Sequence, residues 1–168
     1  MQVHARRQSS LTTALGLMAL AAALVTHAAP ASAAFPGADG QIAFTSDRGG
    51  PIALFSIVPG GSAASIGAPA PSTEPSYSPD GSRIAFVTGA NQIAVINSNG
   101  SGLVQLTTSS TAKQNPAWSP DGTRIAYAAN SFDVDGQTDL EIWTISATGG
   151  APTQITTNTF PDTEPAAR

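Results

Sequence analysis

Apolar and polar positions along the chain predict many short strands and no helices. The apolar residues gather in short runs, at 84–86, 93–96, 125–127 and 142–145, and Gly, Pro, Asn and Asp separate them. Short apolar runs bounded by turn residues are typical of strands, and no stretch keeps the spacing of an amphipathic helix. The runs are apolar at both odd and even positions, which indicates strands covered on both faces.

The pattern repeats along the sequence. Asp-Gly recurs at 39–40, 80–81 and 121–122, a spacing of 41 residues. The two closest copies read PSYSPDGSRIAF at 75–86 and PAWSPDGTRIAY at 116–127. The earliest copy is degenerate and reads only DGQIAF. A period near 41 residues points to a repeat architecture and must be considered before any other fold.

Each unit continues past this motif with a third strand, a Gly turn and a fourth strand. The fourth-strand sequence QLTT at 105–108 matches QITT at 154–157, which lies 49 residues downstream instead of 41. We expect the eight extra residues near 131–138, in a loop, because insertions in a repeat normally map to loops. Four strands per unit with this period predict an all-β fold, a β-propeller of about three four-stranded blades.

The motif at the centre of each copy is a tight turn. Ser suits the first position of a type I turn, Pro presets φ at the second, and Gly suits the fourth. We therefore assign a structural role to the turn residues and not acid–base work to their two carboxylates. Arg83 and Arg124, which follow the turns, are predicted to be exposed charges at strand edges. The assigned turn residues are Ser78, Pro79, Asp80, Gly81, Ser119, Pro120, Asp121 and Gly122.

Ser-Pro-Asp-Gly, with Tyr or Trp just before it and Ile-Ala-Phe or Ile-Ala-Tyr just after, resembles the TolB-type, WD40-like propeller repeat. The resemblance covers roughly residues 35–168, and the Gly-His and Trp-Asp pattern of WD repeats is absent. It implies an exported scaffold that docks other envelope proteins. The repeats follow the leader directly, where that family carries an α/β domain, so a role in a Tol complex does not follow.

The repeat divides the chain into five predicted parts: a signal peptide at 1–34, a degenerate first blade at 35–70, a second blade at 71–111, a third at 112–160 and the start of a fourth at 161–168. Ala167 stands where Tyr77 and Trp118 stand in the other copies. Closed propellers have about four to eight blades, so three leave open edges. A fragment of a longer protein, an oligomer that closes the ring and an open arc all fit.

The amino terminus has the layout of a secretory leader. Arg6 and Arg7 precede an uncharged run at 11–25, and Ala31-Ser32-Ala33 gives a small-residue cleavage site. The run is short for a membrane span, so we predict export and no stable span after cleavage, with an uncleaved anchor as the alternative. Location is therefore extracellular or in the periplasm or cell envelope. Arg6-Arg7-Gln8-Ser9 leaves the twin-arginine and general routes both open.

Cleavage would leave little catalytic chemistry. His4 and His27 both lie in the leader, and the chain has no Cys. This argues against zinc sites, disulfides and Ser-His-Asp or Cys-His machinery, so we predict no enzyme and no cofactor. The leader holds two of the seven basic residues and none of the eleven acids, which leaves a net charge of −6. That charge disfavours nucleic acid and anionic membranes as partners.

Two groups of residues invite other functions. The aromatics could form a sugar-stacking platform, but their repeat positions favour packing between blades. Acidic residues around Gly136 could supply oxygen ligands to calcium, although a solvated loop is the stronger interpretation, as it is for the loop at 47–50. The predicted packing aromatics are Tyr77, Phe86, Trp118, Tyr127 and Trp143, and the candidate calcium ligands are Asp133, Asp135 and Asp139.

The leading functional prediction is a secreted, non-catalytic propeller module that docks a protein or glycan partner. One alternative is a fragment of the gating propeller of a prolyl-oligopeptidase-type serine peptidase, although the G-x-S-x-G elbow of such enzymes is absent here. Another is a calcium- or carbohydrate-binding surface protein. If the native chain ends at Arg168, a homo-oligomer is expected.

Overall fold

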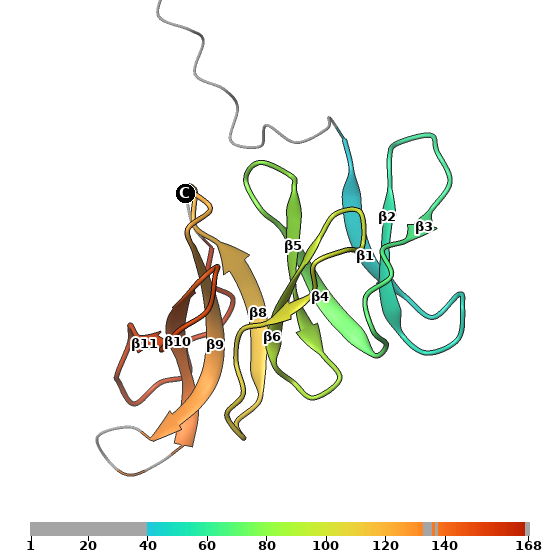
Figure 1. The fold of residues 1–168 in the computed structure, drawn as a ribbon. Helices are drawn as coiled ribbons and strands as arrows, with labels where there is room; N and C mark the ends of the chain where they lie inside the picture. Colours follow the sequence, from blue (N-terminus) through green and yellow to red (C-terminus); the bar gives the residue numbers. More distant parts are fainter. Residues whose placement is uncertain (1–39, 133–135, 137, 167–168) are drawn as a thin grey trace, which may run out of the picture. The chain divides into compact units, whose positions relative to one another are not determined.

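The computed structural model describes residues 40–132, 136 and 138–166, and these contain three antiparallel sheets and no helix. The three sheets lie side by side in chain order (Figure 1). The first is β1 (Ile42–Ser46), β2 (Ala53–Ile57) and β3 (Ala64–Ser65). The second is β4 (Ser72–Tyr77), β5 (Arg83–Thr88), β6 (Ile93–Asn97) and β7 (Val104–Gln105). The third is β8 (Lys113–Trp118), β9 (Arg124–Phe132), β10 (Thr138–Ser146) and β11 (Thr153–Gln154).

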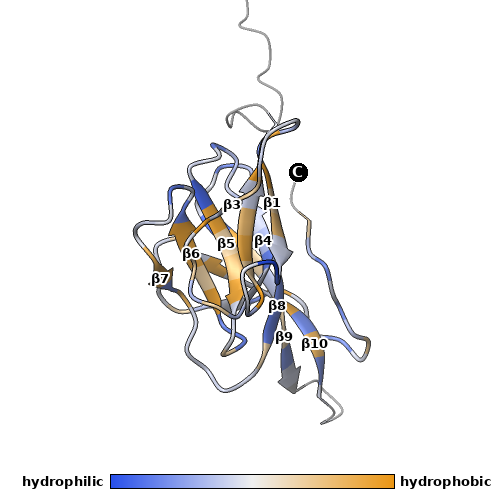
Figure 2. Ribbon diagram, turned by 90° about the vertical axis from the view of Figure 1, so that its right-hand side faces the viewer, coloured by the Kyte–Doolittle hydropathy of each residue, from blue (hydrophilic) through white to orange (hydrophobic). Residues whose placement is uncertain are grey.

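The middle sheet is apolar on both faces because β5 is apolar at 84–87 and β6 at 93–96. Ile84 pairs with Ile96 and their side chains share one face, whereas Val87 pairs with Ile93 on the other. All four are at most 4% exposed. Figure 2 shows β5 and β6 as strongly hydrophobic ribbons.

The sheets pack face to face through two cores. Leu54 and Ile66 of the first sheet meet Phe86 and its neighbours on one face of the second. Val95 on the other face meets Tyr127 of the third sheet. The second and third sheets have four strands each, and the first has three among the described residues. Antiparallel sheets of this kind, stacked face to face, are propeller blades, so the predicted all-β, partial-propeller fold is confirmed.

The two Ser-Pro-Asp-Gly segments form the same hydrogen-bonded turn. The Gly81 N–H donates to the Ser78 carbonyl at 2.8 Å, and Gly122 repeats this with Ser119 at 2.9 Å. Both glycines have positive φ, 69° and 66°, a conformation that costs a side-chain-bearing residue energy. The Ser78 hydroxyl donates to the Asp80 carboxylate at 2.6 Å and accepts from the Arg83 N–H at 2.9 Å. Each turn therefore sets the start of the next strand.

The eight extra residues of the third unit do not simply enlarge a loop. β9 and β10 are nine residues long, against six and five for β5 and β6, and pairing continues to Phe132 and Thr138. The prediction of a loop was therefore wrong for Ser131, Phe132 and Thr138, which are in strands, while 133–135 and 137 lie outside the described residues. An extended hairpin satisfies the backbone N–H and C=O groups that a loop would leave to water.

Arg83 also departs from prediction. Its guanidinium lies 4.7 Å from the centre of the Trp118 ring and donates to the carbonyls of Ala147 and Gly122 at 3.4 and 3.3 Å. Arg83 therefore joins the second sheet to the third and is not an exposed edge charge. Arg124, at the matching place in the third sheet, is exposed and donates to Thr144 of its own sheet at 2.6 Å.

The predicted leader, residues 1–34, lies outside the described residues, as do Ala167 and Arg168. Within the part of the chain that the structure describes, no helix is long and apolar enough to span a membrane.

Candidate functional site: a pocket on the first strands of the blades

An X-Pro pair with unusual geometry recurs at the start of the second and third blades and in the last described segment. Glu74, Asn115 and Glu164 each precede a proline, and each has a φ of 54°. Positive φ is uncommon for residues other than glycine, and a residue before proline normally adopts an extended conformation. Three identical departures from these preferences, at matching points of a repeat, mark a position that the fold itself imposes.

The strained pairs coincide with irregularities in the strands. The register between β4 and β5 shifts between Thr73 and Ser76, and that between β8 and β9 shifts between Gln114 and Ala117. Each shift is a bulge that interrupts the ladder over the X-Pro pair. Bulges re-aim side chains, and proline tolerates such places because no ladder hydrogen bond is required of it.

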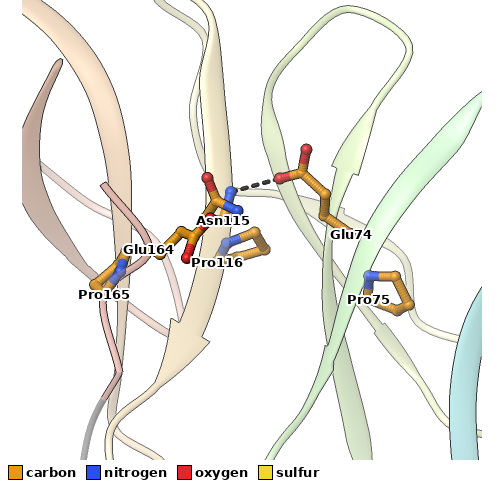
Figure 3. A pocket seen from close by; sticks show the side chains of 6 residues that line it. All are labelled: Glu74, Pro75, Asn115, Pro116, Glu164 and Pro165. Atoms are coloured by element: carbon orange, nitrogen blue, oxygen red, sulfur yellow. Dashed lines mark hydrogen bonds between the residues drawn. The ribbon is translucent and has the colours of Figure 1, made fainter. Parts of the chain in front are cut away.

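The three X-Pro pairs line one pocket of about 380 Å³. Figure 3 shows residues from three successive units around it, with the side chain of Glu164 directed toward Asn115. Glu74 and Glu164 are exposed, Asn115 is half-buried and Pro116 is buried. The pocket is therefore open to solvent and has a rigid, partly apolar wall.

A hydrogen bond joins neighbouring units at the pocket. The backbone N–H of Asn115 donates to the carboxylate of Glu74, 41 residues earlier (Figure 3). The bulge leaves this N–H free of the strand ladder, and the carboxylate satisfies it with a charge-assisted bond. Glu74 is thus held by the blade that follows it.

The pocket has the electrostatics of a site for cations. Of its six lining residues, two are carboxylates and none is basic. Asn115 adds an amide that both donates and accepts hydrogen bonds. The chain as a whole carries a net charge of −4, so its overall electrostatic field also favours a positively charged ligand.

The predicted packing aromatics lie between sheets. Phe86 is fully buried, Tyr127 is 2% exposed and Trp118 is 6% exposed. Trp143 and Tyr77 are half-buried against the two cores. Burial raises the pKa of Tyr127 to about 12 and also raises that of Tyr77. None of the three most buried rings presents a face on which a sugar could stack.

The candidate calcium residues are only partly described. Asp133 and Asp135 lie outside the described residues. Asp139 is half-buried in β10, where it pairs with Ser131. Among the residues that the structure describes, no group of three or more His, Cys, Asp or Glu could hold a metal ion.

Two buried charged residues serve the loops that end the blades. The Lys113 ammonium donates to the hydroxyl groups and carbonyls of Ser109 and Thr111, and its burial lowers its pKa. Glu141, fully buried, accepts from the Asn158 N–H at 2.9 Å and from the Thr156 hydroxyl. These bonds pair buried polar groups, so we assign both residues to structure.

The sequence carries a signal for the pocket outside the Ser-Pro-Asp-Gly motif. Glu74-Pro75, Asn115-Pro116 and Glu164-Pro165 stand at matching points of three successive units. The useful signal is that a polar residue precedes proline in all three copies, on strands that a propeller brings together. The positive φ that turns these residues toward one another is not foreseeable from sequence, because residues before proline rarely adopt it.

Similar folds occur in solved structures. A protein assigned as TolB from Agrobacterium tumefaciens has 22% identity and a TM-score of 0.65, over 76% of this chain and 46% of that chain. An oligogalacturonate lyase in complex with manganese has 10% identity and a TM-score of 0.56, over 68% of this chain and 36% of that one. A tricorn protease has 16% identity and a TM-score of 0.58, over 74% of this chain and 13% of that one.

These similarities show the fold, which is that of part of a TolB-type β-propeller. This chain spans less than half the length of each of the three proteins. No protein-family model matches the sequence, and no curated protein matches it either.

Proposed function

We propose that the chain is an exported, non-catalytic binding module whose pocket holds a basic segment of a partner protein. The observation that carries this proposal is the convergence of three X-Pro pairs, two of them with carboxylates, on one pocket. The leader-like amino terminus supports export to the cell envelope or beyond. The lack of His and Cys after residue 34 supports a role in binding.

The pocket suits a peptide better than a glycan. A Lys or Arg side chain would meet Glu74 and Glu164, and its apolar stem would lie along the proline rings. Phe86, Trp118 and Tyr127 are buried between sheets and offer no face to a sugar. Because the bulges preset the backbone, the site would lose little conformational entropy on binding.

The fold alone does not decide between binding and catalysis. An enzyme that carries a manganese ion and a protease share it with the TolB protein. The test must therefore be able to detect calcium or manganese binding at the pocket as well as peptide binding.

The test is an NMR titration of the isotope-labelled chain with two short peptides, one centred on Arg and one on Glu. We expect the Arg peptide to shift the Asn115 amide signal, because that N–H donates to Glu74. Glu74→Gln and Glu164→Gln are each expected to weaken binding about two- to fivefold, as for exposed ion pairs. Asp47→Asn, an exposed acid outside the pocket, is the control.

Equal affinity for the Arg peptide and the Glu peptide would overturn the proposal that the ligand is basic. A shift of Asn115 with calcium or manganese alone, and none with peptide, would make the pocket a metal site instead. A response only to oligosaccharides would favour the glycan partner.

A further inference from the structure

The first sheet lacks, among the described residues, the strand that opens the other two. Its Ile42–Ile57 pair corresponds to Ile84–Ile96 in the second sheet and Ile125–Ile145 in the third. β1 therefore matches β5 and β9, each of which has a first strand, β4 or β8, on its other edge. The order of the first sheet begins at β1. An edge of this kind is a template for another strand.

The last described residues have the opposite character: they are placed like a first strand but belong to no sheet. The Asp162 N–H donates to the Leu140 carbonyl at 2.6 Å, as Lys113 does to Asn91 at 3.0 Å and Ser72 to Ile52 at 3.1 Å. Glu164 repeats the φ of 54° and joins the pocket. The segment 162–166 is thus placed like β4 and β8, but pairs with no strand of the described residues.

The first sheet also has an apolar face turned away from the second. Ala43 and Leu54 face the second sheet, so Ile42, Phe44 and their cross-strand partners face the other way. The Phe44 and Phe55 rings stack at 6.1 Å, and the exposed Arg48 lies over both. Ile42 is 54% exposed, whereas its counterpart Ile84 is fully buried against the neighbouring sheet.

The third sheet presents the complementary face. Ala85, Val87, Ile93 and Val95 of the second sheet pack against the third, and the matching residues of the third have no sheet beyond them among the described residues. Ile155 is 57% exposed, whereas its counterpart Leu106 is 7% exposed in the core. The matching residues are Ala126, Ile142 and Thr144, which are half-buried, and Ala128, which is fully buried in the single chain.

We propose that a second copy of this chain covers these faces. Segment 162–166 of one copy adds to β1 of the other, and the third sheet of the first copy packs on the first sheet of the second. The reciprocal contact then closes the ring. Both contacts repeat ones that already hold the three sheets together within the chain. Two copies give six blades, within the range of about four to eight for closed propellers, and three copies would exceed it.

The repeat fixes the register of the added strand. Thr73 pairs with Val87, and Gln114 pairs with Ala128. The same register places Thr163 of one copy opposite Thr45 of the other. Both threonines are exposed in the single chain.

Cross-linking tests this register, because the chain has no cysteine of its own. Thr45→Cys and Thr163→Cys are made in separate chains, which are mixed and oxidised. Paired strand residues have the Cα separation that a disulfide needs, so we expect a covalent heterodimer. Thr45→Cys mixed with Thr159→Cys, four residues out of register, is the control.

The mass of the unmodified chain in solution, by light scattering, gives the independent readout. We expect twice the chain mass, and Ile155→Asp is expected to weaken the dimer by at least about tenfold because it places a charge in the buried face. Ile155 is exposed in the single chain, so this variant keeps its fold. Leu103→Asp is the control, at an exposed residue (46%) beside β7 of the second sheet.

A monomer at all concentrations would overturn the proposal. A dimer that forms no Thr45–Thr163 cross-link, or cross-links equally in the control pair, would overturn the strand addition. Peptide binding is measured separately, so failure here leaves the pocket function standing.

Discussion

The aspartates of the two turns accept several hydrogen bonds each. Asp80 accepts from the Ser78 and Ser82 hydroxyl groups and the Ser82 N–H. Asp121 has the same arrangement with Ser119 and Thr123. These bonds favour the charged form, with the serine hydroxyl the largest cause, and lower the pKa of both carboxyls from 3.8 to about 2.

Because the folded pKa is depressed, the stabilisation is present above about pH 4 and is lost as the pH falls toward about 2. We expect the double variant Asp80→Asn, Asp121→Asn to lose less free energy of unfolding across that window than the parent chain. Asn retains one acceptor oxygen, so the turn can still form. Urea unfolding at a series of pH values measures this, with Asp47→Asn as the control. An unchanged pH profile in the double variant would contradict it.

Arg83 and Arg124 are a matched pair that differ in what they touch. Arg83 stacks on Trp118 and reaches two carbonyls of the third sheet, whereas Arg124 reaches only a side chain of its own sheet. We expect Arg83→Ala to reduce the free energy of unfolding by about 1–2 kcal/mol, from the lost cation–π contact and hydrogen bonds. Arg124→Ala is expected to stay within about 0.5 kcal/mol, as for most surface changes.

Urea unfolding at neutral pH compares the two arginine variants. Equal losses of unfolding free energy in Arg83→Ala and Arg124→Ala would show that the contacts of Arg83 with the third sheet add no stability beyond that of a surface charge. Arg83→Lys adds a useful intermediate, because lysine keeps the charge and loses the planar fork.

At the scale of elements, the turns that end the third strands bring neighbouring blades close together. Gly100 has a φ of 84°, and a Cβ there would lie 2.3 Å from the Ile66 carbonyl oxygen of the first sheet. Gly60, in the matching turn of the first sheet, has a φ of 80° and nothing within 4 Å of the same position. The two glycines therefore share a backbone conformation and differ only in the contact.

Substitution of each glycine by Ala separates these effects. Both variants pay the cost of a left-handed residue, roughly 1–2 kcal/mol. We expect Gly100→Ala to lose about 1–3 kcal/mol more than Gly60→Ala, because the backbone it meets must move. Thermal and urea unfolding of the two variants give the difference. Equal losses of unfolding free energy would mean that the close approach of Gly100 to the first sheet has no energetic effect.

Local elements were predictable where their cause is local. Ser-Pro-Asp-Gly sets its own turn through side-chain and backbone bonds within six residues, so the sequence suffices to predict it. The long hairpin of β9 and β10 was not predictable, because its polar residues suit a loop and a solvated strand pair equally well. The role of Arg83 depends on Trp118, 35 residues away and in another sheet, which the strand pattern does not reveal.

At the scale of the whole molecule, the repeat predicted that blades stack, but not which polar residues meet where they do. The three X-Pro pairs are 41 and 49 residues apart, and only the stacking of sheets brings them to one pocket. The open faces have the same origin. Ile42 and Ile155 belong to buried repeat positions, and their exposure follows from the absence of a neighbouring blade among the described residues.

The lengthened hairpin of the third blade has a practical consequence for protein engineering. Pairing along β9 and β10 continues without a register shift, from Arg124–Ser146 out to Phe132–Thr138. Because side chains alternate between faces with a period of two, residues added in matched pairs at its tip leave every existing side chain on its own face. A foreign epitope or a fluorescent reporter could therefore be grafted beyond the Phe132–Thr138 pair without changing the pairing of β9 and β10.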